Sequence, residues 1–311
     1  MISRRNIRVK VMQTLYILST LHDDNGMPDP VRSLQKQIDS SRQLFIYLLY
    51  CLTEVARYAE TDALRRASKN LPSAQDLNVN TKISGNEFLW KLLDNASFKQ
   101  AIENDKPNLV ENTSTQIKKL YNELEKTPEY QVYILAQSRD KKSEKDIITF
   151  IFSTLMLPGE EFVSHVEEHF TNWDDDAEMI NQLMLNYLQK PGSYNLQEMV
   201  SKEKWDFART LLTTTREKKD YALELIKPKL KNWDADRIAV LDMILMEMGV
   251  CELLYFDTIP TKVTINEYID LAKSYSTPQS GHFVNGILDN IHKELMTQNK
   301  IHKVDFKQNA S

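Results

Sequence analysis

The chain has 311 residues and a formal net charge of -5, from 44 acidic and 39 basic side chains. Only 7 residues are glycine and no two stand in a G-x-G arrangement, which excludes the dinucleotide-binding and kinase glycine loops. Two cysteines are too few for a disulfide framework in a chain of this size and fit a reducing cytoplasm. The longest uncharged apolar run, residues 44–52, is shorter than the about 20 residues that a membrane span needs.

The low glycine content, with few alternating β-branched runs and many Leu, Lys, Glu, Gln and Asn residues, predicts an all-α protein. The first predicted helix runs from Ser3, its N-cap, to about Leu21, with apolar residues recurring at three- and four-residue spacing. Arg4, Arg5 and Arg8 fall on the apolar side of this helix. We therefore expect its first turns to project beyond the core, where the arginines are free to bind an anion.

Two other interpretations of these arginines stay open. Residues 3–8 resemble a twin-arginine export signal, although polar residues interrupt the stretch that follows and no cleavage site comes after it. The same residues are also compatible with a loose charged terminus.

The pattern from residue 23 to residue 204 predicts further helices. Residues 23–30 form a break rich in turn-forming residues, a long helix follows over residues 31–69, and residues 70–86 are expected to form a loop. Prolines then separate several helical stretches over residues 87–204. Within them, residues 160–189 carry eight acids and no Lys or Arg, and a surface of that charge repels phosphate.

The tripeptide Asn-Trp-Asp occurs at residues 172–174 and again at residues 232–234, each time before an apolar helix. Helix caps with a tryptophan packing at the helix entry explain both copies, since Asn and Asp favour that position. A true internal duplication stays open as the alternative.

The last third of the chain is predicted to form three helices. Asp234 or Asp236 caps an apolar helix that ends at about Phe256. Residues 264–267 form a capping box that opens a second helix to about Tyr275, and the third helix is amphipathic. The polar tail beyond Gln298 is expected to fray.

A search for catalytic and metal-binding patterns yields one short match. His165 and His169 stand in an H-x-x-E-H sequence, the inverted zinc-protease pattern, on one face of an acidic helix. A solvated helix face explains this pattern without a metal, and no arrangement of nucleophile and histidine suits catalysis. We predict no catalytic residue, no metal and no cofactor.

Two groups of short motifs stand near the two ends of the sequence. The amino-terminal group is Arg4-Arg5-x-x-Arg8-x-x-x-Met12-Gln13-x-Leu15-Tyr16. The carboxyl-terminal group includes Asn232-Trp233, Arg237, Leu241-Asp242, Ile244-Leu245, Glu252-Leu253, Pro260-x-Lys262-Val263-x-Ile265-Asn266-Glu267, Leu271-Ala272-Lys273-x-Tyr275 and Phe283-Val284-Asn285-Gly286-Ile287-Leu288-Asp289. Together these motifs resemble the NusB family of transcription antitermination factors.

The resemblance implies a NusB-type bundle of two helical subdomains that carries an additional helical insertion. Residues 1–25 would be the first helix with its arginine-rich motif, residues 26–202 the insertion or extension, residues 203–297 the rest of the domain, and residues 298–311 a flexible tail. A protein of this family is not an enzyme. It would act in the cytoplasm, bind boxA-type single-stranded leader RNA with ribosomal protein NusE, and join the RNA polymerase antitermination complex on ribosomal RNA operons.

The resemblance also implies two sets of site residues. The RNA-binding set is Arg4, Arg5, Arg8, Lys273, His282 and Phe283, and the NusE-binding set is Tyr16, Asp242 and Glu252. Phe283 is equally compatible with core packing, and Glu252 with an internal contact at a helix end. Met243 after Asp242, and Gln279 with Gly281-His282, depart from the family pattern.

Two alternative functions remain. An RNA methyltransferase that carries a NusB-like domain would need a glycine-rich cofactor-binding half, which this sequence lacks. A protein-interaction scaffold would use the acidic insertion as its working surface and would carry a degenerate RNA site. Co-purification discriminates the scaffold from the antitermination factor, since only the latter brings down NusE and leader RNA.

Overall fold

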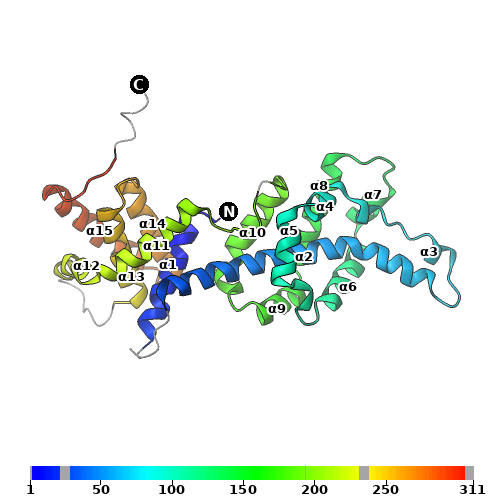
Figure 1. The fold of residues 1–311 in the computed structure, drawn as a ribbon, viewed down its shortest axis with the longest axis horizontal. Coiled ribbons are helices and arrows are strands. Elements are labelled where there is room, and N and C mark those ends of the chain that lie inside the picture. The colour runs from blue at the N-terminus through cyan, green and yellow to red at the C-terminus, as the bar shows by residue number, and fades with distance from the viewer. Residues whose placement is uncertain (1, 22–28, 193, 231–237, 305–311) are drawn as a thin grey trace, which may run out of the picture. The chain divides into compact units, whose positions relative to one another are not determined.

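The computed structural model describes residues 2–21, 29–192, 194–230 and 238–304, and its regular elements in these ranges are all helices (Figure 1). The prediction of an all-α protein is confirmed. The helices of the first half are α1 (Arg4–Thr20), α2 (Pro30–Ala67), α3 (Ala74–Leu77), η1 (Lys82–Gly85), α4 (Glu87–Leu93), α5 (Ala96–Asp105), η2 (Pro107–Leu109), α6 (Thr113–Leu124), α7 (Pro128–Leu135), α8 (Lys141–Phe150) and η3 (Ile151–Met156). Those of the second half are α9 (Glu160–His169), α10 (Trp173–Gln189), α11 (Lys202–Glu217), α12 (Lys219–Ile226), η4 (Lys227–Lys229), α13 (Val240–Tyr255), α14 (Thr261–Tyr275) and α15 (Ser280–Thr297).

The chain divides into two compact units. Unit 1 is the continuous segment Ile38–Met199, whereas unit 2 combines Ile2–Gln37 with Val200–Ser311. Unit 2 is therefore built from both ends of the chain, and the boundary near residue 38 falls within helix α2.

Helices α1 and α2 agree with the sequence pattern. The Ser3 hydroxyl accepts a hydrogen bond from the Asn6 amide at 3.1 Å, so Ser3 caps α1 as predicted. The apolar centre of α2, residues 44–49, is buried. The segment 70–86, predicted as a loop, also contains two short helices, one of them capped reciprocally by Ser73 and Asp76.

The predicted capping box at residues 264–267 is wrong. Helix α14 begins three residues earlier, at Thr261, and Thr264 is buried. Its hydroxyl donates to the buried Glu252 carboxylate at 2.9 Å, and a buried carboxylate requires such donors. The Thr264 side chain therefore serves this internal contact and does not cap the helix. The proposed caps Asp234 and Asp236, like the second Asn-Trp-Asp copy, lie outside the described residues.

Helix α13 is the centre of unit 2 and packs against α1, α11, α12, α14 and α15 (Figure 1). Helix α13 lies close to α15 at Gly249, where an added Cβ would lie 2.9 Å from a methyl carbon of Leu288. The same Cβ would lie 3.4 Å from the Tyr268 ring. A side chain at position 249 would therefore collide with the core that α13 shares with α14 and α15.

The segment after α15 contacts α13, although the sequence predicted a frayed tail from residue 298. Ile301 is buried, and the Lys303 ammonium donates to the backbone oxygens of Glu252 and Phe256 at 3.0 and 2.8 Å. These oxygens belong to the carboxyl-terminal end of α13, where carbonyls lack helical partners and a cation is favourable. Residues 305–311 of the predicted tail lie outside the described residues.

Unit 1 is organised around the part of α2 that follows residue 38. Arg42 on α2 forms two hydrogen bonds with the Asp105 carboxylate, at 2.6 and 2.7 Å. The buried Tyr47 hydroxyl lies 2.6 Å from Nε2 of His165 and 2.9 Å from the Thr113 hydroxyl. These hydrogen bonds connect α2 to α5, α6 and α9, and they pair the polar groups that the apolar core encloses.

We predict that Gly249→Ala destabilises the protein. Overpacking of a filled core costs about 1–3 kcal/mol, and only part of it is offset by the about 1 kcal/mol higher helix propensity of alanine. The measurement is the free energy of unfolding in urea. Gly286→Ala on α15 is the matched control, since its Cβ would meet no atom within 4 Å, and we expect it to be neutral or stabilising. Equal effects of the two substitutions would contradict the close packing at Gly249.

Candidate nucleic-acid interface

The first turn of α1 carries two partly exposed arginines, each beside an acid from another helix. Arg4 pairs with Glu203 at the start of α11, with 2.6 Å between Nη2 and Oε1. Arg5 pairs with Asp270 on α14, with 3.4 Å between Nη1 and Oδ2. Both arginine side chains are 41% exposed, so both guanidinium groups are accessible to a ligand from solvent.

A chain of contacts links this turn to the second predicted RNA-binding stretch. The other oxygen of Asp270 lies 3.8 Å from Nζ of Lys273, one helical turn further along α14. The aliphatic part of Lys273 lies over Gly281, where an added Cβ would be 2.6 Å from its Cγ. His282, the next residue, is exposed and Phe283 is half-buried. Asp270 therefore brings Arg5 and Lys273 together on one surface, and the exposed His282 follows the glycine that Lys273 covers. Arg4 stands beside Arg5 in the first turn of α1.

Arg8 is buried, in contrast to its two neighbours. Its Nε and Nη2 atoms donate to the two oxygens of the Glu252 carboxylate at 2.8 and 2.7 Å, and both side chains are at most 2% exposed. The Arg8 guanidinium also lies 5.4 Å from the centre of the Phe207 ring. Burial by itself lowers the pKa of Arg8, but the hydrogen bonding of Glu252, together with the charges of Tyr268, Glu252 and Glu267, outweighs it and raises that pKa above its ordinary value.

The Glu252 carboxylate is fully satisfied by this arrangement. Besides Arg8, it accepts hydrogen bonds from the Thr264 hydroxyl at 2.9 Å and from the Tyr268 hydroxyl at 3.1 Å. Burial, followed by the charge of Glu252, raises the pKa of Tyr268 well above its ordinary value, so its hydroxyl stays a donor. The cluster of Arg8, Glu252, Thr264 and Tyr268 joins α1, α13 and α14.

These contacts correct two predictions. Arg8 was predicted to bind RNA, but its guanidinium is enclosed and bound on two sides. Glu252 was predicted to bind NusE, but it is the internal partner of Arg8 and is inaccessible. The physical reason is the same for both, because a buried charge is stable only when it is paired and hydrogen-bonded.

Asp242 is also internal, whereas Tyr16 is exposed. Asp242 was predicted to bind NusE, but it is 5% exposed and accepts a hydrogen bond from the Ser280 hydroxyl at 2.7 Å. Ser280 starts α15, so this bond joins the first turns of α13 and α15. Of the three predicted NusE contacts, Tyr16 therefore remains available, at 41% exposure.

Sequence reasoning missed the acids that face the arginines. Asp270 has a weak local signal, because it stands three positions before Lys273 on one helix. Glu203 has none, since 199 positions separate it from Arg4. Only the packing of α1 against α11 reveals that pair.

The two zinc-pattern histidines are engaged with other groups. Nε2 of His165 is bound to the Tyr47 hydroxyl, and His169 Nδ1 lies 2.9 Å from the His165 backbone oxygen. Among the residues that the structure describes, no group of His, Cys, Asp and Glu side chains has the arrangement of a metal site. Burial also raises the pKa values of Cys51 and Cys251 to about 12, which keeps both thiols protonated and unreactive.

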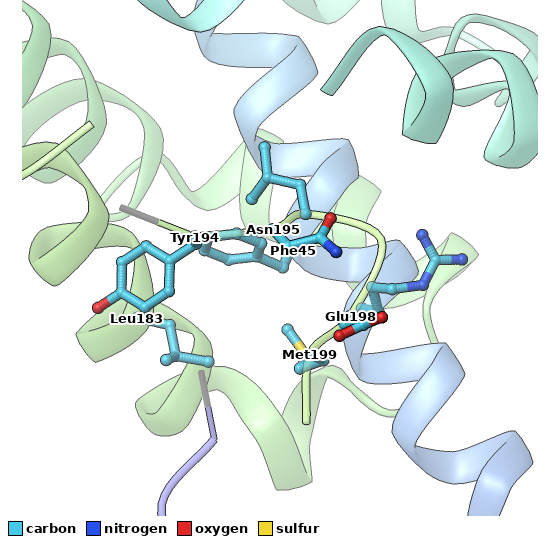
Figure 2. A pocket seen from close by; sticks show the side chains of 8 residues that line it. Phe45, Leu183, Tyr194, Asn195, Glu198 and Met199 are labelled. Carbon is cyan, nitrogen blue, oxygen red and sulfur yellow. The ribbon is translucent and has the colours of Figure 1, made fainter. Parts of the chain in front are cut away.

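The described cavities show no built ligand site. Figure 2 shows one between α2, α10 and the segment 194–199, where Phe45, Leu183 and Met199 lie around a space of about 20 Å³, roughly one water molecule. An open groove of about 560 Å³ lies between α7 and α8, lined by Val132, Ile147 and other residues of these two helices. In the described part of the chain no single helix combines the length and apolarity of a membrane span, although Lys141–Met156 and Glu160–His169, bent by 79°, do so as a pair.

We predict that Arg8→Ala destabilises unit 2 by about 3–5 kcal/mol, because it leaves the Glu252 carboxylate buried without its partner. The free energy of unfolding in urea measures this loss. Arg4→Ala is the matched control on the same helix, and its exposed pair should contribute less than about 1 kcal/mol. If the two substitutions cost the same, the buried pair does not hold α1 in place.

We also predict that acidification destabilises unit 1 through His165. Burial, and then the nearby His169, lower the pKa of His165, so the unfolded chain binds its proton at a higher pH than the folded chain does. Stability is therefore fully present above about pH 6.5 and falls as the pH drops below that ordinary value. His165→Gln should flatten this dependence in thermal unfolding followed between pH 7.5 and 5. An unchanged pH dependence in the variant would exclude His165 as its source.

Comparison with known proteins identifies relatives for the carboxyl-terminal part of the chain. A family model described as the NusB family matches residues 165–293. Three relatives carry the name transcription antitermination protein NusB. The Salinibacter ruber protein is 43% identical over 98 residues, which cover 32% of this chain and 61% of that one. The Chloroherpeton thalassium protein is 47% identical over 72 residues, covering 23% and 34%, and the Finegoldia magna protein is 38% identical over 94 residues, covering 30% and 69%.

A solved structure of NusB from T. maritima is 35% identical and covers 41% of this chain and 82% of its own, with a TM-score of 0.30. The matched range of the family model contains Lys273, His282 and Phe283 but leaves out α1. In the first two relatives above, the match spans 61% and 34% of their length. With more than two thirds of the Finegoldia protein matched at 38% identity, this chain belongs to the NusB family.

Proposed function

We propose that this protein is a transcription antitermination factor that binds boxA-type single-stranded leader RNA together with ribosomal protein NusE. In this role it would join the RNA polymerase antitermination complex in the cytoplasm and support transcription of ribosomal RNA operons. It would act by binding, without catalysis. The names of its relatives support the general role, and the surface of unit 2 supports the RNA-binding part.

The observation that carries the proposal is the continuity of the cationic surface. Arg4 and Arg5 come from the start of the chain, and Lys273 comes from the matched region near its end. The contacts of Asp270 with both Arg5 and Lys273 bring these two cations onto one surface, and Arg4 precedes Arg5 in the first turn of α1. A localised cluster of this kind on a protein with net charge -5 attracts phosphate, whereas the acidic residues 160–189 repel it.

The residue types on this surface suit unpaired RNA. The planar guanidinium groups of Arg4 and Arg5 fit phosphate oxygens, and Lys273 provides a further positive charge. The exposed His282 ring and the half-buried Phe283 ring lie next along α15, where an unstacked base could rest on them. Phosphate contacts would hold the strand, and ring contacts would select for single-stranded bases.

We further propose that residues 26–202 are an insertion in a NusB-type domain. In the sequence, unit 1 (Ile38–Met199) separates the two segments that form unit 2. Helix α1, from the first segment, packs against α11 and α13, from the second, in one core. Tyr16, the accessible member of the predicted NusE set, lies on α1 within this domain.

An interaction scaffold is the second candidate function. Seven of the eight acids in residues 160–189 are not buried, and the eighth, Asp176, is bound to the Ser41 hydroxyl at 2.6 Å. The exposed acids on α9 and α10 would suit a basic protein partner. Recovery of protein partners without NusE or leader RNA in a pull-down from cells would favour this candidate.

We predict that Arg4→Ala with Arg5→Ala weakens binding of boxA-type RNA while the protein stays folded. The loss of two phosphate contacts should reduce the slope of log affinity against log salt by about 1.4, at about 0.7 per contact with a single strand. Fluorescence anisotropy with labelled RNA at several salt concentrations gives both values.

Arg216→Ala with Lys219→Ala is the matched control, because it removes the same charge from the last turn of α11 and the start of α12. Arg216 lies about 20 Å from Glu203 along α11, at about 1.5 Å per residue. The proposal fails if the arginine variant keeps the affinity and slope of the unchanged protein, or if the control loses as much.

A further inference from the structure

We propose that Glu203 and Asp270 are internal competitors of the RNA, and that they occupy Arg4, Arg5 and Lys273 until phosphates displace them. The inference rests on the proposed RNA-binding function and adds a control of its affinity. In this view the cationic surface is held in a partly neutralised state before the RNA arrives. Binding is then an exchange of carboxylates for phosphates at the same guanidinium and ammonium groups.

The charge balance of the surface supports this exchange. Three cations face two carboxylates, and Asp270 serves two of the cations, with one oxygen 3.4 Å from Arg5 and the other 3.8 Å from Lys273. Glu203 neutralises Arg4 at 2.6 Å. A phosphate that approaches any of these cations therefore meets a carboxylate already bound there. Attraction by the cations is reduced by the repulsion of that carboxylate.

Exposure separates these replaceable pairs from the permanent one. Glu203 is 77% and Asp270 is 51% exposed, whereas both members of the Arg8 and Glu252 pair are at most 2% exposed. Exposed pairs are weak because water solvates both charges, so a phosphate can replace the carboxylate at little cost. A buried pair cannot be opened in this way, because each charge would be left without a partner in the core.

The released carboxylates would not be left in an unfavourable place. Glu203 lies in the first turn of the sixteen-residue helix α11, where the helix dipole stabilises a negative charge even without Arg4. Asp270 lies on the exposed side of α14 and returns to water. The exchange therefore leaves the helices of unit 2 intact and changes only the side chains at its surface.

An opposite role for the two acids is physically possible, and it predicts the opposite result. Glu203 and Asp270 could hold the arginine side chains in the orientation that the RNA needs, as carboxylates behind metal-binding histidines orient those histidines. Removal of their charge would then weaken RNA binding instead of strengthening it. The sign of the effect therefore decides between competition and positioning.

The test uses the full chain with Glu203→Gln, Asp270→Asn, and both together. We expect each single substitution to tighten binding of a boxA-type RNA about two- to five-fold at 0.15 M salt, and the double variant to tighten it further. A scrambled RNA of equal length should gain by the same factor, because the carboxylates contact cations and not bases. Fluorescence anisotropy measures both affinities.

Glu217→Gln is the matched control for charge. It makes the same substitution on α11 about 21 Å from Glu203, at about 1.5 Å per residue, beyond the about 8 Å over which salt screens charges. We expect it to leave the affinity unchanged. In an Arg4→Ala background the gain from Glu203→Gln should fall to the level of this control, since the competed cation is gone.

The outcomes separate this inference from the proposed function. Unchanged or weaker binding by Glu203→Gln and Asp270→Asn, with binding still weakened in the Arg4 and Arg5 double variant, overturns the competition and leaves the RNA-binding function standing. If that arginine variant binds RNA as well as the unchanged protein does, the RNA-binding function fails. The absence of binding by every variant counts against both.

Discussion

The bidentate ion pair between Arg8 and Glu252 holds the amino-terminal helix against the last third of the chain. These residues are 244 positions apart, and their side chains meet inside unit 2 with Thr264 and Tyr268 as additional donors. The cluster requires α1, α13 and α14 to pack at one place, so it also places the first turn of α1 beside α14. The surface formed by Arg4, Arg5 and Lys273 exists because this internal pair positions α1.

Three arginines of one helical motif thus have different physical roles. Arg8 lies one turn deeper in the helix than Arg4 and Arg5, at a position enclosed by α13 and α14, and it is a structural residue. Arg4 and Arg5 lie where α1 emerges from the core, and they keep contact with solvent. Burial, and not residue type, separates the structural cation from the two that remain accessible from solvent.

Unit 1 has its own apolar core, with a few buried hydrogen bonds, and a different surface charge. Its buried hydrogen bonds, such as that between Tyr47 and His165, join residues of unit 1 to one another. The acids on α9 and α10 give it a surface that repels phosphate. The small net charge of the chain is an average over an acidic unit and a localised cationic surface, and so it describes neither of them.

The sequence by itself determined the all-α class, the start of α1 at Ser3 and the family, because helix periodicity, capping and short motifs are local properties of neighbouring residues. It also located the exposed cations Arg4, Arg5 and Lys273. It misassigned Arg8, Asp242 and Glu252, and it missed Glu203, because burial and ion pairing depend on residues far away in the chain. Only the tertiary structure decided which charges face each other, since α1, α11, α13 and α14 meet through packing that no local pattern encodes.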